Sequence, residues 1–202
     1  MIKYVKKILS NPLAYSLFTN AIGGQKPIKI FVNKYLTIKE GDRVLDIGCG
    51  PGDLITHLPK GTSYLGFDIS EDYIKSAKQK YGDKGEFIIG TCDSVNLSHL
   101  KFDIIIASGL IHHLDDEEVK SLYRLSNEVL STHGKLVSLD CMLYKGQPAL
   151  EKWIISQDRG EYVREKDDYL NLSRKFFSKI SSFSHHNMLR IPYSHLVQIC
   201  YK

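Results

Sequence analysis

Short apolar runs alternate with longer mixed segments along the chain from residue 41 onward. Runs this short, separated by turn residues, are typical of buried strands, whereas the segments between them have the 3.6-residue period of helices. Strand–helix alternation of this kind predicts an α/β fold with a parallel sheet and right-handed crossovers. The predicted strands lie at about residues 43–47, 63–69, 85–90, 102–108 and 135–143.

Two of the helices predicted between these strands have clear start signals. One covers Glu71–Tyr81, with Ser70 as its N-cap. The other begins at the acidic cluster Asp115–Glu118 and ends at His133–Gly134. The acids could hold magnesium, but acids at a helix start also stabilise the helix dipole. We therefore predict no metal site.

The pattern changes after residue 143. Ala149–Ser156 and Asp167–Ile180 have helical periodicity, whereas Phe183–Arg190 and His195–Tyr201 have the pattern of strands. The two strands are joined at 191–194, which predicts a terminal antiparallel hairpin.

Composition limits the class of protein. A chain of 202 residues that is 43% apolar can bury one core, so we expect a single domain. No stretch approaches the ~20 apolar residues of a membrane span and no signal peptide is apparent, so we expect a cytoplasmic protein. Its four cysteines lack the paired spacing of a zinc site or a disulfide framework: Cys49, Cys92, Cys141 and Cys200.

The N-terminal segment, residues 1–39, is electrostatically distinct, with seven lysines and no acid. Ile2, Val5 and Leu9 fall on one face of a predicted basic amphipathic helix. This helix either packs as a lid on the core or contacts an anionic lipid surface or substrate. Both interpretations stay open.

A glycine-rich turn follows the first predicted strand. Gly48, Gly50 and Gly52 have the spacing G-x-G-x-G, and Asp46 lies two residues ahead. Glycines here let a ligand approach backbone N–H groups at a helix start. A dinucleotide fingerprint would place its third glycine at position 53, which is Asp53. The spacing therefore indicates a nucleoside cofactor with one ribose and no phosphate.

This loop resembles motif I of the class I S-adenosylmethionine-dependent methyltransferases, and the resemblance extends over residues 40–143. A second strand ends at Asp68, where the family's acid accepts hydrogen bonds from both ribose hydroxyls. Residues 102–114 resemble the strand and following segment that line the family's active site. The resemblance implies S-adenosylmethionine as cofactor and a Rossmann-like seven-stranded, mostly parallel sheet with helices on both faces. Its seventh strand would lie antiparallel between the fifth and sixth.

The chain departs from the family where an acid usually contacts adenine. Gly90 is followed by Thr91, so Cys92 and Asp93 are the candidates for adenine recognition, unless Asp93 only caps the turn. The resemblance implies these cofactor-binding residues: Asp46, Gly48, Cys49, Gly50, Gly52, Asp68, Ile69, Cys92, Asp93, Ser108 and Leu110.

His112 and His113 follow the fourth strand, where parallel-sheet enzymes bind their ligands. Methyl transfer to a hydroxyl needs alignment and the removal of one proton, for which a neutral histidine is a suitable base. We predict His112 and His113 as the catalytic pair, with His113 expected to pack beneath the cofactor. The expected reaction is O-methylation of a small molecule or glycan precursor.

The region 144–202 is expected to shape the acceptor pocket. Arginines bind carboxylate or phosphate, which hints at an anionic acceptor, although solvation or a structural ion pair is the stronger interpretation for each arginine taken separately. The chain lacks the N-P-P-Y-like motif of enzymes that methylate nucleic-acid amines, and a net charge of +4 is modest, so we expect no nucleic acid. The candidate substrate-binding residues are Trp153, Arg159, Arg164, His186 and Arg190.

Two other classes of protein remain open. An NAD(P)-dependent oxidoreductase would use the same fold and Asp68, but should have the third loop glycine. A non-catalytic S-adenosylmethionine-binding protein would bind the cofactor without turnover. The sequence distinguishes neither a monomer from a homodimer nor the identity of the acceptor.

Overall fold

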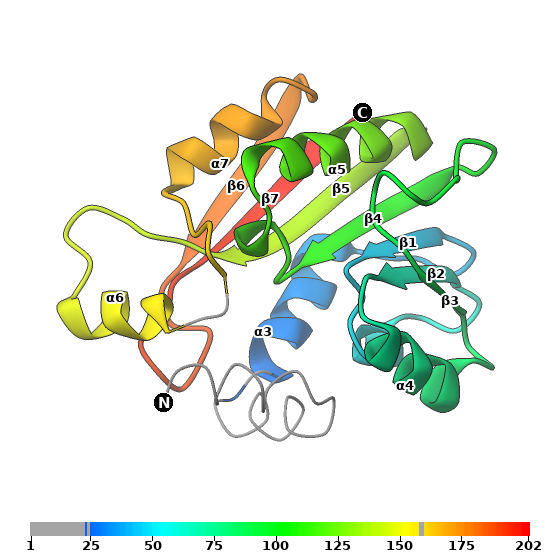
Figure 1. Cartoon of the computed structure of the whole chain (residues 1–202), viewed down its shortest axis with the longest axis horizontal. Coiled ribbons are helices and arrows are strands. Elements are labelled where there is room, and N and C mark those ends of the chain that lie inside the picture. The colour runs from blue at the N-terminus through cyan, green and yellow to red at the C-terminus, as the bar shows by residue number, and fades with distance from the viewer. Residues whose placement is uncertain (1–22, 24, 158–159) are drawn as a thin grey trace.

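A computed structural model describes residues 23, 25–157 and 160–202 (Figure 1). A seven-stranded sheet runs through it in the order β3-β2-β1-β4-β5-β7-β6. β7 pairs antiparallel with both of its neighbours, and the other pairings are parallel. The strands are β1 Arg43–Ile47, β2 Ser63–Asp68, β3 Glu86–Ile89, β4 Phe102–Ser108, β5 Leu130–Cys141, β6 Lys179–His185 and β7 His195–Tyr201. The predicted sheet and the insertion of its last strand are confirmed.

Helices cover both faces of this sheet. α5 and α7 lie over one face, and α3 and α4 lie on the other side in Figure 1. A 3-10 turn, Asp53–His57, follows the glycine-rich loop, and another, Ile111–His113, follows β4. The helices are α3 Gln25–Ile30, which continues as a π-helix over Phe31–Leu36, α4 Glu71–Tyr81, α5 Asp116–Val129, α6 Ala149–Ser156 and α7 Lys166–Ser173.

Alternation along the central strands divides the core into two layers. Ile105 and Ala107 of β4 join the cluster that contains α5 and α7 residues, whereas Ile104 and Ile106 join the one that contains α4 residues. Successive residues of a strand point to opposite faces. All four side chains are buried because helices cover both faces of the sheet. A strand covered on both faces therefore reads as one continuous apolar run.

The start of β5 differs from the prediction. Helix α5 ends at Val129 rather than at His133–Gly134, and β5 begins at Leu130 instead of residue 135. Leu130 is buried and pairs with Phe102, and the register then shifts before Ile104 meets Lys135. Pairing with β4 thus extends the strand through a segment that local signals assign to a helix.

The C-terminal elements also begin earlier than predicted. α7 covers Lys166–Ser173, not Asp167–Ile180, and β6 covers Lys179–His185, not Phe183–Arg190. β6 pairs along the whole of β7, with Lys179 opposite Tyr201, so the strand begins at the far end of its partner. The hairpin connection is consequently residues 186–194, longer than the predicted turn.

The predicted N-terminal amphipathic helix, with Ile2, Val5 and Leu9, lies outside the described residues. Within the described part, Phe31, Tyr35 and Leu36 are buried against the sheet. No helix in the ranges that the structure covers is long and apolar enough to cross a bilayer.

The acidic cluster before α5 forms a capping box. The Asp115 carboxylate accepts hydrogen bonds from the backbone N–H groups of Glu117 and Glu118, both at 2.9 Å. The Glu118 carboxylate accepts from the Asp115 N–H at 2.9 Å. These reciprocal bonds satisfy backbone donors that the first helical turn leaves unpaired.

Asp115→Ala is expected to lower the free energy of unfolding by about 1 kcal/mol, because the N-cap acceptor is lost. Asp115→Asn should retain most of it, since asparagine caps equally well. Urea denaturation of both variants measures the difference. Equal stability of Asp115→Ala and wild type would contradict the capping role.

Candidate functional site

The glycine-rich loop lies at the carboxyl end of β1, where the sheet order reverses direction along the chain. Gly48, Gly50 and Gly52 have φ of 68°, 54° and 78°, in the left-handed region. The N–H groups of Gly48 and Cys49 donate to the Phe67 carbonyl at 2.8 and 3.0 Å. The loop is therefore bonded to the neighbouring strand β2.

The three glycines are needed for different reasons. A Cβ at Gly52 would lie 2.7 Å from Cε1 of Phe87, and one at Gly48 would lie 2.8 Å from Cδ1 of Leu110. A Cβ at Gly50 would meet nothing within 4 Å. Gly48 and Gly52 thus allow packing inside the protein, whereas Gly50 borders open space that a ligand could occupy.

Asp68 ends β2 beside this loop. Its Oδ2 accepts from the Gly50 N–H at 3.0 Å, and its Oδ1 accepts from the Ser70 N–H at 2.8 Å. Each carboxylate oxygen has further lone pairs, so both can still accept from a ligand hydroxyl. Asp68 is half-buried, and its carboxylate is held at the edge of the open space.

Asp46 and Cys49 lie deeper, beneath the loop. Asp46 is 3% exposed and accepts from the Tyr64 hydroxyl at 2.7 Å. The pKa of Asp46 is raised to about 7. Burial is the largest cause, the hydrogen bond from Tyr64 partly offsets it, and repulsion by Asp68 raises the pKa further. A ligand cation near Asp46 would favour its ionised form. Burial raises the pKa of the Cys49 thiol, and its side chain fits against Gly66, so it packs rather than reacts.

An apolar surface flanks the loop on the β2 and β3 side. Ile69, after β2, is 75% exposed, and Ile89, at the end of β3, is 54% exposed. Large exposed apolar side chains at adjoining strand ends suit one face of a flat ring. The sequence pointed to Ile69 but not to Ile89.

The turn after β3 is closed by Ser94 rather than by Asp93. The Ser94 hydroxyl, not the Asp93 carboxylate, accepts from the Thr91 N–H at 2.7 Å. Asp93 is exposed, and Cys92 is half-buried against the core. Burial raises the pKa of Cys92 to about 12, so the thiol stays protonated. The adenine-contacting roles of Cys92 and Asp93 remain predictions.

His112 is paired with a carboxylate at the carboxyl ends of β4 and β5. It is 5% exposed, and its Nδ1 lies 2.9 Å from Oδ1 of Asp140, which also accepts from the His112 backbone N–H at 3.2 Å. An Nδ1–H that donates to Asp140 leaves the basic lone pair on Nε2. The ring of His113 lies against that of His112, with centroids 4.2 Å apart.

A backbone segment covers this dyad closely. A Cβ at Gly160 would lie 2.2 Å from Cδ2 of His112, and the Tyr162 N–H donates to the His112 carbonyl at 3.0 Å. Only glycine permits that approach. Gly160 therefore packs directly against the imidazole.

Arg164 makes structural hydrogen bonds, which favour the alternative of a structural ion pair over contact with the acceptor. Its guanidinium donates to the carbonyls of Ile111, Leu114 and Tyr162 at 2.9 to 3.2 Å, and to Asp116 at 2.8 and 3.2 Å. These bonds use all five N–H groups of an arginine. Arg164 fastens the segment after β4 and has no donor left for a substrate.

The other predicted acceptor residues come from separate elements. Trp153 on α6 is 60% exposed, and Arg190 packs along Gly23, whose Cβ would lie 2.9 Å from Cγ of Arg190. His186 follows β6 and bonds Ser194. Arg159 lies outside the described residues.

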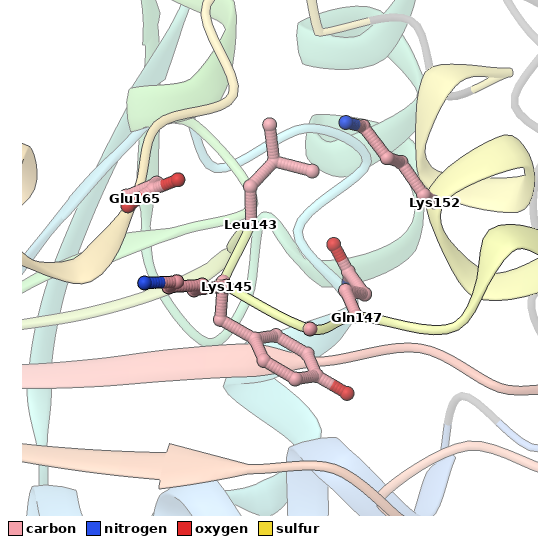
Figure 2. Close-up of a pocket in the computed structure, with 7 residues that line it drawn as sticks. Leu143, Lys145, Gln147, Lys152 and Glu165 are labelled. Atoms are coloured by element: carbon pink, nitrogen blue, oxygen red, sulfur yellow. The ribbon is translucent and has the colours of Figure 1, made fainter.

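A cavity of about 300 Å³ adjoins the end of β5 (Figure 2). Lys145 and Gln147 line it from the segment after β5, Lys152 from α6, and Glu165 from the start of α7. Of these four residues, the sequence pointed to Lys145 as a polar group near a possible pocket, but not to Gln147, Lys152 or Glu165. Two lysines against one acid make the cavity net positive, which favours an anionic guest.

Sequence reasoning also missed the buried partners of the site. Asp140 is 2% exposed and Glu151 is 4% exposed. Acids in an otherwise apolar strand and on the inner face of α6 were the available signals, because a buried carboxylate needs a partner. In the described ranges no three His, Cys, Asp or Glu side chains come together as a metal site would need.

Residues 44–134 match the model of a family described as a methyltransferase domain. Phosphoethanolamine N-methyltransferase 1 of Zea mays is 31% identical over 152 residues, which are 73% of this chain. The chain spans 30% of the length of that protein and of its counterpart in Triticum aestivum.

Two solved structures have a similar fold. A TehB-like S-adenosylmethionine-dependent methyltransferase from Corynebacterium glutamicum has a TM-score of 0.65 at 14% identity, over 95% of this chain and 98% of that one. Phosphoethanolamine N-methyltransferase 2 of Haemonchus contortus, in complex with phosphomonomethylethanolamine and S-adenosylhomocysteine, has a TM-score of 0.68 at 15% identity. That match covers 90% of this chain and 53% of the other.

Gly50→Ala and Gly52→Ala are a matched pair of substitutions. The first adds a methyl group to the space proposed for the ligand, and the second adds one inside the packed core. Gly50→Ala should weaken S-adenosylhomocysteine binding at least tenfold and cost about 1–2 kcal/mol of stability, the cost of a left-handed alanine. Gly52→Ala should destabilise by more, because its methyl collides with Phe87. Calorimetry and thermal unfolding measure the two effects. Undiminished affinity in Gly50→Ala would contradict the assignment.

Proposed function

Because the chain belongs to the class I S-adenosylmethionine-dependent methyltransferases, we propose that it transfers a methyl group from S-adenosylmethionine to a small-molecule acceptor. The observation that carries the proposal is the carboxylate of Asp68, held by Gly50 and Ser70 beside open space at the carboxyl end of β1. This membership argues against the NAD(P)-dependent oxidoreductase. A turnover assay tests the non-catalytic alternative, which requires binding of S-adenosylmethionine without transfer of its methyl group.

The residues present fit the cofactor. Asp68 would accept hydrogen bonds from the ribose hydroxyls, and the space beside Gly50 would admit the nucleoside. Ile69 and Ile89 would supply apolar contacts to the adenine, and Asp46 would favour the ammonium group of the amino-acid end. Gly48, Cys49 and Gly52 shape the loop, and Leu110 packs against Gly48. Ser108, the last residue of β4, would contact the cofactor from that strand end.

When bound, S-adenosylmethionine supplies a methyl group that is displaced from a sulfonium in line with the attacking oxygen. His112 would accept at Nε2 the proton that the acceptor hydroxyl loses when its oxygen takes the methyl group. Asp140 orients the imidazole and stabilises the imidazolium that results. The Gly160 segment keeps the ring in place.

We propose an anionic acceptor, such as a phosphorylated small molecule or a glycan precursor. The support for it moves from the arginines to Lys145 and Lys152, which line the cavity beyond β5. Incubating the protein with labelled S-adenosylmethionine and fractionated cell extract, then identifying the labelled product, tests the acceptor class.

A second candidate reaction is N-methylation of an amine that carries a phosphate, the kind of substrate named for the maize relative. The observation that favours it is the position of the Glu151 carboxylate. It accepts a hydrogen bond from the Tyr144 hydroxyl, and Tyr144 lines the same cavity as the two lysines. A cavity with cationic groups and a nearby carboxylate suits a zwitterion.

Asp68→Ala is expected to weaken S-adenosylhomocysteine binding about a hundredfold or more. Two charge-assisted hydrogen bonds at ~1.5–3 kcal/mol each would be lost. Asp72→Ala, which removes an exposed acid four residues away, is the control and should bind as wild type does. Unchanged affinity in Asp68→Ala, or tighter binding of NAD than of S-adenosylmethionine, would overturn the cofactor assignment.

His112→Asn is expected to reduce turnover ~10²–10⁴-fold while S-adenosylhomocysteine affinity stays nearly constant, because a general base acts in the chemical step. The kinetics use the acceptor identified from extract. His133→Asn, at an exposed histidine, is the control, and His113→Asn separates the two members of the pair. Full turnover in His112→Asn would show that the proton leaves by another route.

A further inference from the structure

Four polar side chains meet where α6 packs against the connection between β6 and β7. Glu151 accepts hydrogen bonds from the Ser194 hydroxyl and from the Tyr144 hydroxyl, the latter at 3.2 Å. Nδ1 of His186 lies 2.8 Å from the Ser194 oxygen. The rings of Tyr144 and His186 pack edge to face, with centroids 4.9 Å apart. Glu151 and Ser194 are buried, and His186 is exposed.

The number of protons in this cluster fixes the direction of each hydrogen bond. Burial raises the pKa of Glu151, but bonds from Ser194, Gln147 and Tyr144 and the nearby His186 lower it below its ordinary value. An ionised carboxylate can only accept, so the single hydroxyl proton of Ser194 is given to Glu151. Nδ1 of His186 must then carry the proton that Ser194 accepts, and the lone pair of the neutral ring lies on Nε2.

The cluster lies on the acceptor side of the proposed active site. The Met142 N–H donates to the Ser194 carbonyl at 3.1 Å, and Met142 directly follows β5, the strand that carries Asp140. Tyr144 contacts Glu151 and also lines the cavity that contains Lys145. His186 is thus connected, through Tyr144, to the place where we propose that an anionic acceptor binds.

We propose that Glu151, Ser194 and His186 form a hydrogen-bonded relay that presents Nε2 of His186 as the hydrogen-bond acceptor for a hydroxyl or ammonium group of the methyl acceptor. The proposal rests on the function proposed above, because it needs an acceptor in the lysine-lined cavity. Glu151 and Ser194 are positioning residues that act through His186. The relay selects acceptors that carry both an anionic group and a donor group.

The tautomer of His186 tests the relay without any substrate. Long-range ¹H–¹⁵N NMR spectra of the labelled protein, assigned with His186→Gln, should show neutral His186 protonated at Nδ1. Ser194→Ala should remove this preference, because the hydroxyl oxygen that accepts from Nδ1 is lost. His133, an exposed histidine, is the internal control and should not respond.

The wild-type spectrum needs no substitution, so it is informative even where a variant fails to fold. Protonation of wild-type His186 at Nε2 would overturn the proposal. So would an unchanged tautomer in a folded Ser194→Ala variant, whose smaller side chain removes the connecting hydroxyl.

Binding is tested on protein saturated with S-adenosylhomocysteine, with phosphoethanolamine and glycerol phosphate as donor-bearing probes and inorganic phosphate as the matched control. Both donor-bearing probes should shift the Nε2 resonance of His186, and phosphate should not. His186→Gln should weaken binding of the donor-bearing probes about tenfold and leave phosphate binding unchanged. An equal shift with phosphate, or none with either donor-bearing probe, would overturn the relay as an acceptor site.

Failure of this inference differs from failure of the proposed function. Calorimetry with S-adenosylhomocysteine on the wild-type protein tests the latter alone. No binding would contradict the proposed methyl transfer, and with it the acceptor role of His186. Normal binding together with an Nε2-protonated His186 would contradict only the relay.

Discussion

The hydrogen bond from the Gly50 N–H to the Asp68 carboxylate is the constraint on which the site depends. It joins the loop after β1 to the end of β2, and the bonds from Gly48 and Cys49 to the Phe67 carbonyl reinforce it. The same carboxylate accepts from Ser70, whose hydroxyl caps α4. The Asp68 side chain therefore links the loop to the start of α4. The same two bonds hold its carboxylate in one orientation, so it can bind a ligand without reorganisation.

Features with local causes could be predicted from the sequence. The strands β1, β2 and β4, the helix Glu71–Tyr81 and its Ser70 cap follow from periodicity and from capping chemistry. The left-handed turn also follows, because glycine is the residue that adopts positive φ without strain. The cofactor side of the site was accessible for this reason: its loop and its acid each follow a strand end.

Features with distant causes could not be predicted. Four of the five hydrogen bonds of Arg164 reach the segment that follows β4, about fifty residues earlier in the chain, and no local signal indicates these partners. Asp140 pairs with His112 and Glu151 with Ser194, and only the tertiary fold brings these partners together. The early start of β5 has the same origin, since pairing with Phe102 outweighs the local helical signal.

The placement of β7 between β5 and β6 also governs how the chain reaches its fold. Strands β1 to β5 can pair as they emerge during synthesis, but β5 keeps one edge open until residues 195–201 are available. Within the described sheet, β6 pairs with β7 alone, so it too waits for that strand. An open apolar edge is a template for pairing with other chains. In the interval before β7 docks, β5 therefore presents an open apolar edge, and β7 removes it by pairing with the whole of that strand's C-terminal part.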